Sequence, residues 1–200
     1  MDLQLHNQHV LITGGSKGIG LACAQAFLQE GAKVSLVSRD TANLGKARQT
    51  LQTQFAADRI HTVAADLRDA QAALAALDSA EAAFGPVDVL VNSAGAAKRT
   101  PAPELTPEAW QDAMQAKYFT YIHMINPSIQ RMAARGAGAV VNVVGNGGKV
   151  ASPIHLPGGA ANAALMLASA GLATLPPLPT TLTTAPLPQA AMRWMLGLIM

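Results

Sequence analysis

Charged and aromatic residues are scarce in this 200-residue chain, and cysteine is nearly absent. Only 13% of the residues are charged and 4% are aromatic, whereas 50% are hydrophobic, which is typical of a compact interior rich in small aliphatic side chains. The 14 basic and 12 acidic residues form neither a basic block nor a basic–aromatic stripe, so we expect no nucleic-acid partner. The single Cys23 excludes an internal disulfide.

Long apolar runs are also missing. No uninterrupted apolar stretch reaches the length of a membrane span, and the start MDLQLHNQHV lacks a basic segment followed by an apolar core. We therefore expect a cytoplasmic protein without a membrane partner, and we expect no metal site.

Short β-type runs alternate with longer helical patterns up to about residue 170. The runs are brief, rich in Val and Ile, and apolar on both faces, as buried parallel strands are. They are HVLIT (9–13), KVSLV (33–37), RIHTVAA (59–65), VDVLV (87–91) and AVVNVV (139–144). Helices are expected near 18–30, 41–56, 70–84, 107–134 and 159–170. This order predicts an α/β fold with a doubly wound parallel sheet of the Rossmann type.

The composition changes after residue 170. Residues 171–200 contain five Pro, five Thr and a single charge, Arg193. Proline cannot donate to a sheet ladder, so this stretch does not resemble a central strand. We predict an α/β domain over 1–170 and an irregular, Pro/Thr-rich C-terminal tail over 171–200.

The segment TGGSKGIG lies where the first expected strand turns into a helix, and it places Gly14, Gly18 and Gly20 in that turn. The first glycine permits a sharp turn, the second permits close approach of a pyrophosphate, and the third permits close packing of helix on strand. Free N–H groups at the helix start then face the phosphate charge. The strand–turn–helix context favours a dinucleotide site over a structural turn.

A second small-residue turn follows the fourth expected strand, with the sequence NSAG from Asn92 to Gly95. In a sheet of strand order 3-2-1-4-5, the ends of strands one and four flank the switch-point crevice. We therefore expect both turns to line one cleft.

TGGSKGIG, NSAG and the Asp66-Leu67 pair after strand three together resemble the short-chain dehydrogenase/reductase family over residues 5 to about 170. The resemblance implies that Gly14, Ser16, Gly18, Ile19 and Gly20 contact the phosphates and ribose of a dinucleotide. It also implies that Asp66 and Leu67 hold the adenine and that Asn92, Ala94 and Gly95 line the wall beside the nicotinamide.

The end of strand two bears on the choice of cofactor. An NAD-selective site places a carboxylate about 20 residues beyond the glycines, but here that position is Ser38, followed by Arg39. Two cations, Lys17 and Arg39, would suit a 2′-phosphate, which favours NADP(H) over NAD. Asp40, one residue further on, is the argument against this interpretation.

The catalytic residues that the family resemblance implies are not found at their expected positions. Family members use Ser, a YxxxK pair and a helix-four Asn; alignment places Gly145, His155, Gly159 and Lys117 at these positions. An altered site could use His155 as proton donor, Lys117 as the cation, and Asn162 or Asn146 to bind the carbonyl. His155 could equally be a loop histidine and Lys117 a solvated charge.

The sequence thus predicts an atypical family member with an aberrant C-terminus that lacks the last strands of the family fold, which would leave strand five at an exposed edge. Its expected function is NADP(H)-dependent hydride transfer to or from a small carbonyl or alcohol, in a homo-oligomer. The alternatives are a catalytically silent nucleotide-binding protein and a damaged product that folds poorly.

Overall fold

The computed structural model describes residues 3–96, 99–173 and 197–199. Helices and strands alternate along the chain, as the sequence predicts. The strands are β1 (His9–Thr13), β2 (Lys33–Ser38), β3 (Ile60–Ala64), β4 (Val89–Asn92), β5 (Ala139–Val143) and β6 (Gly197–Ile199). The helices are α1 (Gly18–Gln29), α2 (Thr41–Gln52), α3 (Ala70–Phe84), α4 (Pro107–Ala113), α5 (Thr120–Arg135) and α6 (Leu156–Ala173). Short 3-10 turns lie at Ala57–Arg59, Ala102–Glu104 and Asn146–Gly148.

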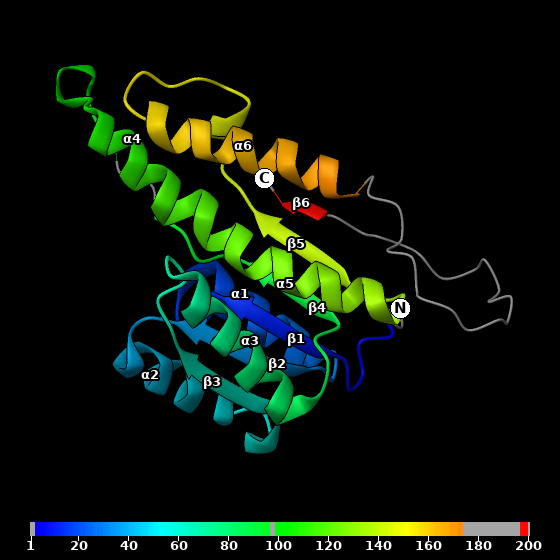
Figure 1. Cartoon of the computed structure of the whole chain (residues 1–200). Helices are drawn as coiled ribbons and strands as arrows, with labels where there is room; N and C mark the ends of the chain where they lie inside the picture. Colours follow the sequence, from blue (N-terminus) through cyan, green and yellow to red (C-terminus); the bar gives the residue numbers. More distant parts are fainter. Residues whose placement is uncertain (1–2, 97–98, 174–196, 200) are drawn as a thin grey trace, which may run out of the picture.

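In the part of the chain that is described, the strands form one parallel sheet of order β3-β2-β1-β4-β5-β6. The order reverses between β1 and β4, so the switch point predicted from the sequence is present (Figure 1). The doubly wound fold is confirmed.

Helices cover both faces of the sheet because alternate strand residues point to opposite sides. On one face Leu11 and Leu90 pack with α3, α5 and α6, and on the other Val10 and Ile12 pack with α1 and α2. These side chains are almost completely buried, which explains why the strands read as continuous apolar runs.

Two expectations about the C-terminal part need correction. Residues 171–173 still belong to α6, which also begins earlier than predicted because Pro157 is accommodated in its first turn. Gly197–Ile199 pair with β5 in parallel register, so β5 is not the edge strand. The rest of the predicted tail, 174–196 and residue 200, lies outside the described residues.

Helix α6 is long and apolar enough to cross a membrane by length and composition alone. In this fold it packs on the sheet as a core helix does, and its buried residues include Ala161, Leu165 and Ser169.

The helix predicted over 107–134 contains a feature that the apolar periodicity does not show. Between α4 and α5 the backbone adopts a π-helix, Met114–Phe119, here called the π-segment. Such segments insert an extra residue into a helical turn and often lie at functional sites.

A buried histidine at the amino end of β1 makes the free energy of unfolding depend on pH. The ring nitrogens of His9 lie 2.8 Å from the Gly85 carbonyl oxygen and 2.8 Å from Ser35 Oγ. Burial lowers the pKa of His9, although the Gly85 carbonyl, Asp88 and Glu81 oppose this effect. The folded protein therefore holds His9 in its neutral form more strongly than the unfolded chain does.

We expect the free energy of unfolding to fall as pH drops below the unfolded histidine pKa of about 6.5, because the unfolded state then binds more protons than the folded state. Urea unfolding of the wild type and of His9→Gln at pH 7.5 and pH 5.5 tests this. The difference between the two pH values should be smaller in the variant; an equal difference would contradict the assignment to His9.

Candidate dinucleotide site

The glycine loop after β1 is shaped by contacts that exclude side chains. Gly14 and Gly18 have φ values of +65° and +55°, a region that favours glycine. A Cβ at Gly20 would collide with the carbonyl oxygen of Gly14 and lie 2.8 Å from its carbonyl carbon. The loop and the first turn of α1 therefore approach more closely than any other residue would allow.

Helix α1 begins in this loop with its first N–H groups open. Lys17 occupies the position before the helix, and no side chain among the described residues caps it. Uncapped N–H groups at a helix start form a site for an anion such as a phosphate.

The second predicted turn lies directly against the first. Thr13 Oγ1 accepts hydrogen bonds from the backbone N–H groups of Ser93 (3.0 Å) and Ala94 (3.1 Å). A Cβ at Gly14 would lie 2.9 Å from the Ala94 Cα, so the two loops are in van der Waals contact. The expectation that both turns meet in one cleft is confirmed.

A cavity of about 620 Å³ opens between these loops at the carboxyl ends of the strands. Ten of the residues predicted to bind the cofactor line it: Gly14, Ser16, Lys17, Ile19, Ser38, Arg39, Asp66, Leu67, Ala94 and Gly95. The other three lie beside or beneath the lining. Gly18 and Gly20 shape the loop, and Asn92 is fully buried below it. Placement in the cavity is thus established, while contact with a cofactor stays a prediction.

Sequence reasoning missed several residues of the lining, among them Ala116, Thr120 and Arg68. Arg68 pairs with Asp66: its Nη2 lies 2.6 Å from Oδ2, and its Nε lies 3.1 Å from both carboxylate oxygens. The hydrogen bond from Arg68 lowers the pKa of Asp66, and Arg39 contributes to the same effect. The spacing Asp66-x-Arg68 is the sequence feature from which this ion pair could have been predicted.

The end of β2 carries the groups relevant to cofactor choice. Ser16 Oγ donates to Ser38 Oγ at 3.0 Å, and the exposed Arg39 follows at the cavity edge. The Asp40 carboxylate instead accepts from the Asn43 N–H at 2.9 Å and caps α2. Asp40, the acidic residue that argued against NADP(H), is therefore occupied as a helix cap and is not part of the cavity lining.

A chain of buried polar groups lies beneath the cavity. Asn92 Nδ2 donates to Asn142 Oδ1 (3.0 Å), and Asn142 Nδ2 donates to Ser169 Oγ (2.8 Å), which donates to the Leu165 carbonyl (2.7 Å). The chain connects β4, β5 and α6 through groups that are almost fully buried. It holds the end of β4, from which the second loop starts.

Lys117 projects from the π-segment to the end of β5. Its Nζ donates to Tyr121 Oη (2.9 Å) and to the Val143 carbonyl (2.8 Å), and Tyr121 Oη donates to the same carbonyl (2.8 Å). Burial lowers the pKa of Lys117 to about 8 and raises that of Tyr121. The expectation that Lys117 could be a freely solvated charge does not hold, because its side chain is half-buried and its amine is hydrogen-bonded to two protein oxygens.

His155 and Asn162 lie around the loop that follows β5. Asn162 Oδ1 accepts from the Gly145 N–H (2.9 Å), and its Nδ2 donates to the Gly158 carbonyl (2.9 Å). The His155 ring packs between Gly147 and Gly158, and its buried Nδ1 has no partner among the described residues.

The structure therefore brings Lys117, Asn162 and His155 to one segment, residues 143–148. Gly159 lies there too, since a Cβ at Gly159 would be 2.8 Å from the Gly147 carbonyl oxygen. None of these residues belongs to the described lining of the nucleotide cavity. Their catalytic roles stay predictions. In the described ranges, no group of three or more His, Cys, Asp or Glu is placed to hold a metal.

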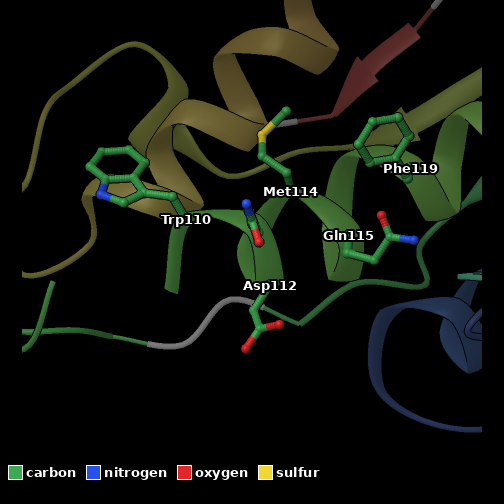
Figure 2. A pocket seen from close by; sticks show the side chains of 6 residues that line it. Trp110, Asp112, Met114, Gln115 and Phe119 are labelled. Carbon is green, nitrogen blue, oxygen red and sulfur yellow. The ribbon is translucent and has the colours of Figure 1, made fainter. Parts of the chain in front are cut away.

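A second cavity, of about 650 Å³, is lined by residues of α4 and the π-segment. Figure 2 shows Trp110 and Met114 rising toward α6, with Asp112 pointing away. Trp110 and Phe119, which also lines it, are each more than one-third exposed.

The switch-point cleft, the glycine loop and the open helix start define a nucleotide-binding protein of the Rossmann class. The family model for short chain dehydrogenases matches residues 8–175. The chain belongs to the short-chain dehydrogenase family.

Curated relatives include D-threitol dehydrogenase of Mycolicibacterium smegmatis, 34% identical over 157 residues, which are 78% of this chain and 59% of the relative. L-xylulose reductase of Mesocricetus auratus is 38% identical over 144 residues, 72% of this chain and 55% of the relative. The chain thus spans little more than half the length of these two proteins.

Solved structures show the same fold. L-sorbose reductase of Gluconobacter frateurii, complexed with NADPH and L-sorbose, has a TM-score of 0.81 at 32% identity. The match covers 87% of this chain and 66% of the reductase chain. An NADPH-bound short chain oxidoreductase of Pseudomonas aeruginosa, described as containing an atypical catalytic center, has a TM-score of 0.79 at 29% identity, with coverages of 84% and 66%.

Proposed function

We propose that this chain is an NADP(H)-dependent oxidoreductase that transfers hydride between the nicotinamide and a small carbonyl or alcohol. The observation that carries the proposal is the cavity at the switch point, which has the glycine loop on one side and the Ala94–Gly95 turn on the other. The residues present fit a dinucleotide: Gly14 and Gly20 let the loop, the second turn and the start of α1 pack closely, and Gly18, with nothing within 4 Å of an added Cβ, leaves the loop bare of side chains where a pyrophosphate would approach.

When bound, NADP(H) supplies or accepts the hydride. The chain's own residues would hold it at defined places: the N–H groups of the glycine loop would face the pyrophosphate, and Asp66 and Leu67 would enclose the adenine. His155, Lys117 and Asn162 are the candidate groups for the carbonyl chemistry. Polyol and sugar relatives support a small hydroxylated substrate.

With its single cysteine the chain has no internal disulfide that would need an oxidising compartment, which is compatible with action in the cytoplasm. The exposed apolar side chains Trp110, Phe119 and Leu167 support a homo-oligomer that covers the helices α4 to α6.

The alternative function is nucleotide binding without turnover. It is favoured by Gly145, His155 and Gly159, which stand where the family resemblance implies Ser, Tyr and Lys. Titration of the purified protein with NADPH, followed by assays on a panel of small ketones, aldehydes and ketoses, separates the two functions. Tight binding with turnover supports the oxidoreductase, tight binding without turnover selects the alternative, and absence of binding overturns both.

Arg39 is expected to set the preference for the phosphorylated cofactor. A charge-assisted hydrogen bond contributes about 1.5–3 kcal/mol, so Arg39→Ala should raise the Kd of NADPH roughly 10- to 100-fold and change that of NADH less than about threefold. Fluorescence titration with both cofactors measures this.

The matched control is Arg48→Ala, which removes an exposed arginine of α2 outside the cavity lining and should leave the preference unchanged. If Arg39→Ala weakens the binding of NADPH and of NADH equally, Arg39 does not contact the 2′-phosphate.

A further inference from the structure

Lys117 is a half-buried cation without a carboxylate partner in the described part of the chain. Its Nζ contacts two oxygens, Tyr121 Oη and the Val143 carbonyl, and both are neutral acceptors. An ammonium group has three N–H donors, so one donor has no acceptor among the described residues. A surface lysine would not be held in this way.

The lysine belongs to the π-segment. The helix has an altered turn over Met114–Phe119, and Lys117 lies inside it. Tyr121 follows four residues later, and the Lys117 Nζ lies 4.5 Å from the centre of its ring as well as within hydrogen-bond distance of its hydroxyl. Tyr121 is itself fully buried, so its hydroxyl is a fixed acceptor.

The lysine also lies against a residue of the wall of the nucleotide cavity. Gly95 lines the cavity, and a Cβ at Gly95 would lie 2.5 Å from Lys117 Cδ and 3.2 Å from its Nζ. The neighbours of the lysine in the helix, Ala116 and Thr120, line the same cavity. The absence of a side chain at Gly95 is what leaves room for the amine at this wall.

We propose that Lys117 donates the proton to the substrate oxygen and that Tyr121 is the positioning residue that holds the Lys117 amine at the cavity wall. This inference rests on the proposed function. The hydride adds two electrons to the carbonyl carbon, and the carbonyl oxygen takes a proton from the Lys117 Nζ. The product is the alcohol; Lys117 becomes a neutral amine and regains its proton from water. In the direction of alcohol oxidation, the neutral amine accepts the same proton.

The geometry favours Lys117 over His155 for this role. The His155 ring packs against backbone, with Nε2 2.7 Å from where a Cβ at Gly158 would lie. Both side chains have a nitrogen with an unused hydrogen-bonding position, but His155 packs against Gly147 and Gly158, which do not line the cavity, whereas Lys117 lies against Gly95, which does. Burial without a counter-charge also keeps its pKa near 8, close to the range in which a proton donor is most effective.

Kinetics of Lys117→Met test the proposal. General acid catalysis contributes about 10²–10⁴ in rate, so kcat for ketone reduction should fall at least about 100-fold in this variant. The Kd of NADPH, measured by fluorescence, should stay within about threefold because Lys117 does not line the cavity. Lys46→Met removes an exposed lysine of α2 and should change neither quantity.

The pH profile separates proton donation from a structural role. In the wild type, kcat/KM for reduction should fall as pH rises through about 8, since the lysine then loses its proton. Lys117→Met should lack this fall. In Tyr121→Phe the ammonium loses one acceptor, so the fall should move to lower pH.

Chemical labelling provides a readout that does not depend on turnover. Acetic anhydride acylates neutral amines, so the rate of Lys117 modification, followed by peptide mass spectrometry, should reach half its maximum near pH 8. Bound NADPH should protect Lys117, because it would cover Gly95, the lining residue against which the amine lies. Tyr121→Phe should shift the half-point to lower pH.

The outcomes distinguish this inference from the proposed function. If the wild type binds NADPH and reduces a ketone but Lys117→Met keeps the rate and the pH profile, Lys117 is not the donor, although the enzyme function stands. If His155→Gln rather than Lys117→Met removes the fall in rate, the donor is His155. If the wild type binds NADPH without any turnover, both proposals are overturned.

Discussion

Replacing Gly20 by alanine is expected to weaken NADPH binding roughly 100-fold, which corresponds to about 2.8 kcal/mol. The new Cβ would collide with the carbonyl oxygen of Gly14, which is a backbone atom and cannot turn aside as the end of a flexible side chain can. The start of α1 must therefore move away from the loop, and its N–H groups no longer point toward the phosphate site. The same overpacking should lower the free energy of unfolding by about 1–3 kcal/mol.

Isothermal titration with NADPH and urea unfolding measure the two effects. Gly45→Ala is the matched control, because Gly45 lies in α2 with nothing within 4 Å of an added Cβ. That change should leave binding intact and stabilise the helix by about 0.5–1 kcal/mol. If Gly20→Ala binds NADPH like the wild type, the phosphate site does not lie at this loop.

Replacing Asn142 by leucine is expected to lower the free energy of unfolding by about 2–4 kcal/mol. Asn142 is completely buried, and its side chain joins Asn92 to Ser169. Leucine has a similar size, so the main loss is polar: the Asn92 amide is left buried without its acceptor. The Ser169 hydroxyl also loses its donor.

Urea unfolding measures this loss, and Ser169→Ala is the graded control. It removes only the far end of the chain, with an expected cost near 1 kcal/mol. A cost for Asn142→Leu no larger than that of Ser169→Ala would mean that the chain of amides is not a source of stability.

The fold was predictable because its signals are local. Each strand is an apolar run of the length that a buried parallel strand requires, and Gly14 and Gly20 occupy positions where only glycine fits. The juxtaposition of the two loops was also predictable, since it follows from the strand order alone.

The surroundings of the site were not predictable in the same way, because they depend on tertiary contacts. The sequence leaves Lys117 open between a catalytic cation and a solvated helix charge, and only the π-segment and the end of β5 show that its amine is held by protein oxygens. Asp40 reads as a possible ribose ligand until its hydrogen bond to Asn43 identifies it as a helix cap. Pairing of Gly197–Ile199 with β5 crosses more than 50 residues of sequence and has no local signal.

The hydroxyl of Thr13 has a consequence for how a ligand arrives. By accepting from the N–H groups of Ser93 and Ala94, it joins the first loop to the second without any ligand. Both walls of the cleft are thus preorganised, and the backbone loses little conformational entropy when a dinucleotide enters. Association should then resemble docking onto a rigid surface, with differences in affinity among related nucleotides expressed mainly in their residence times.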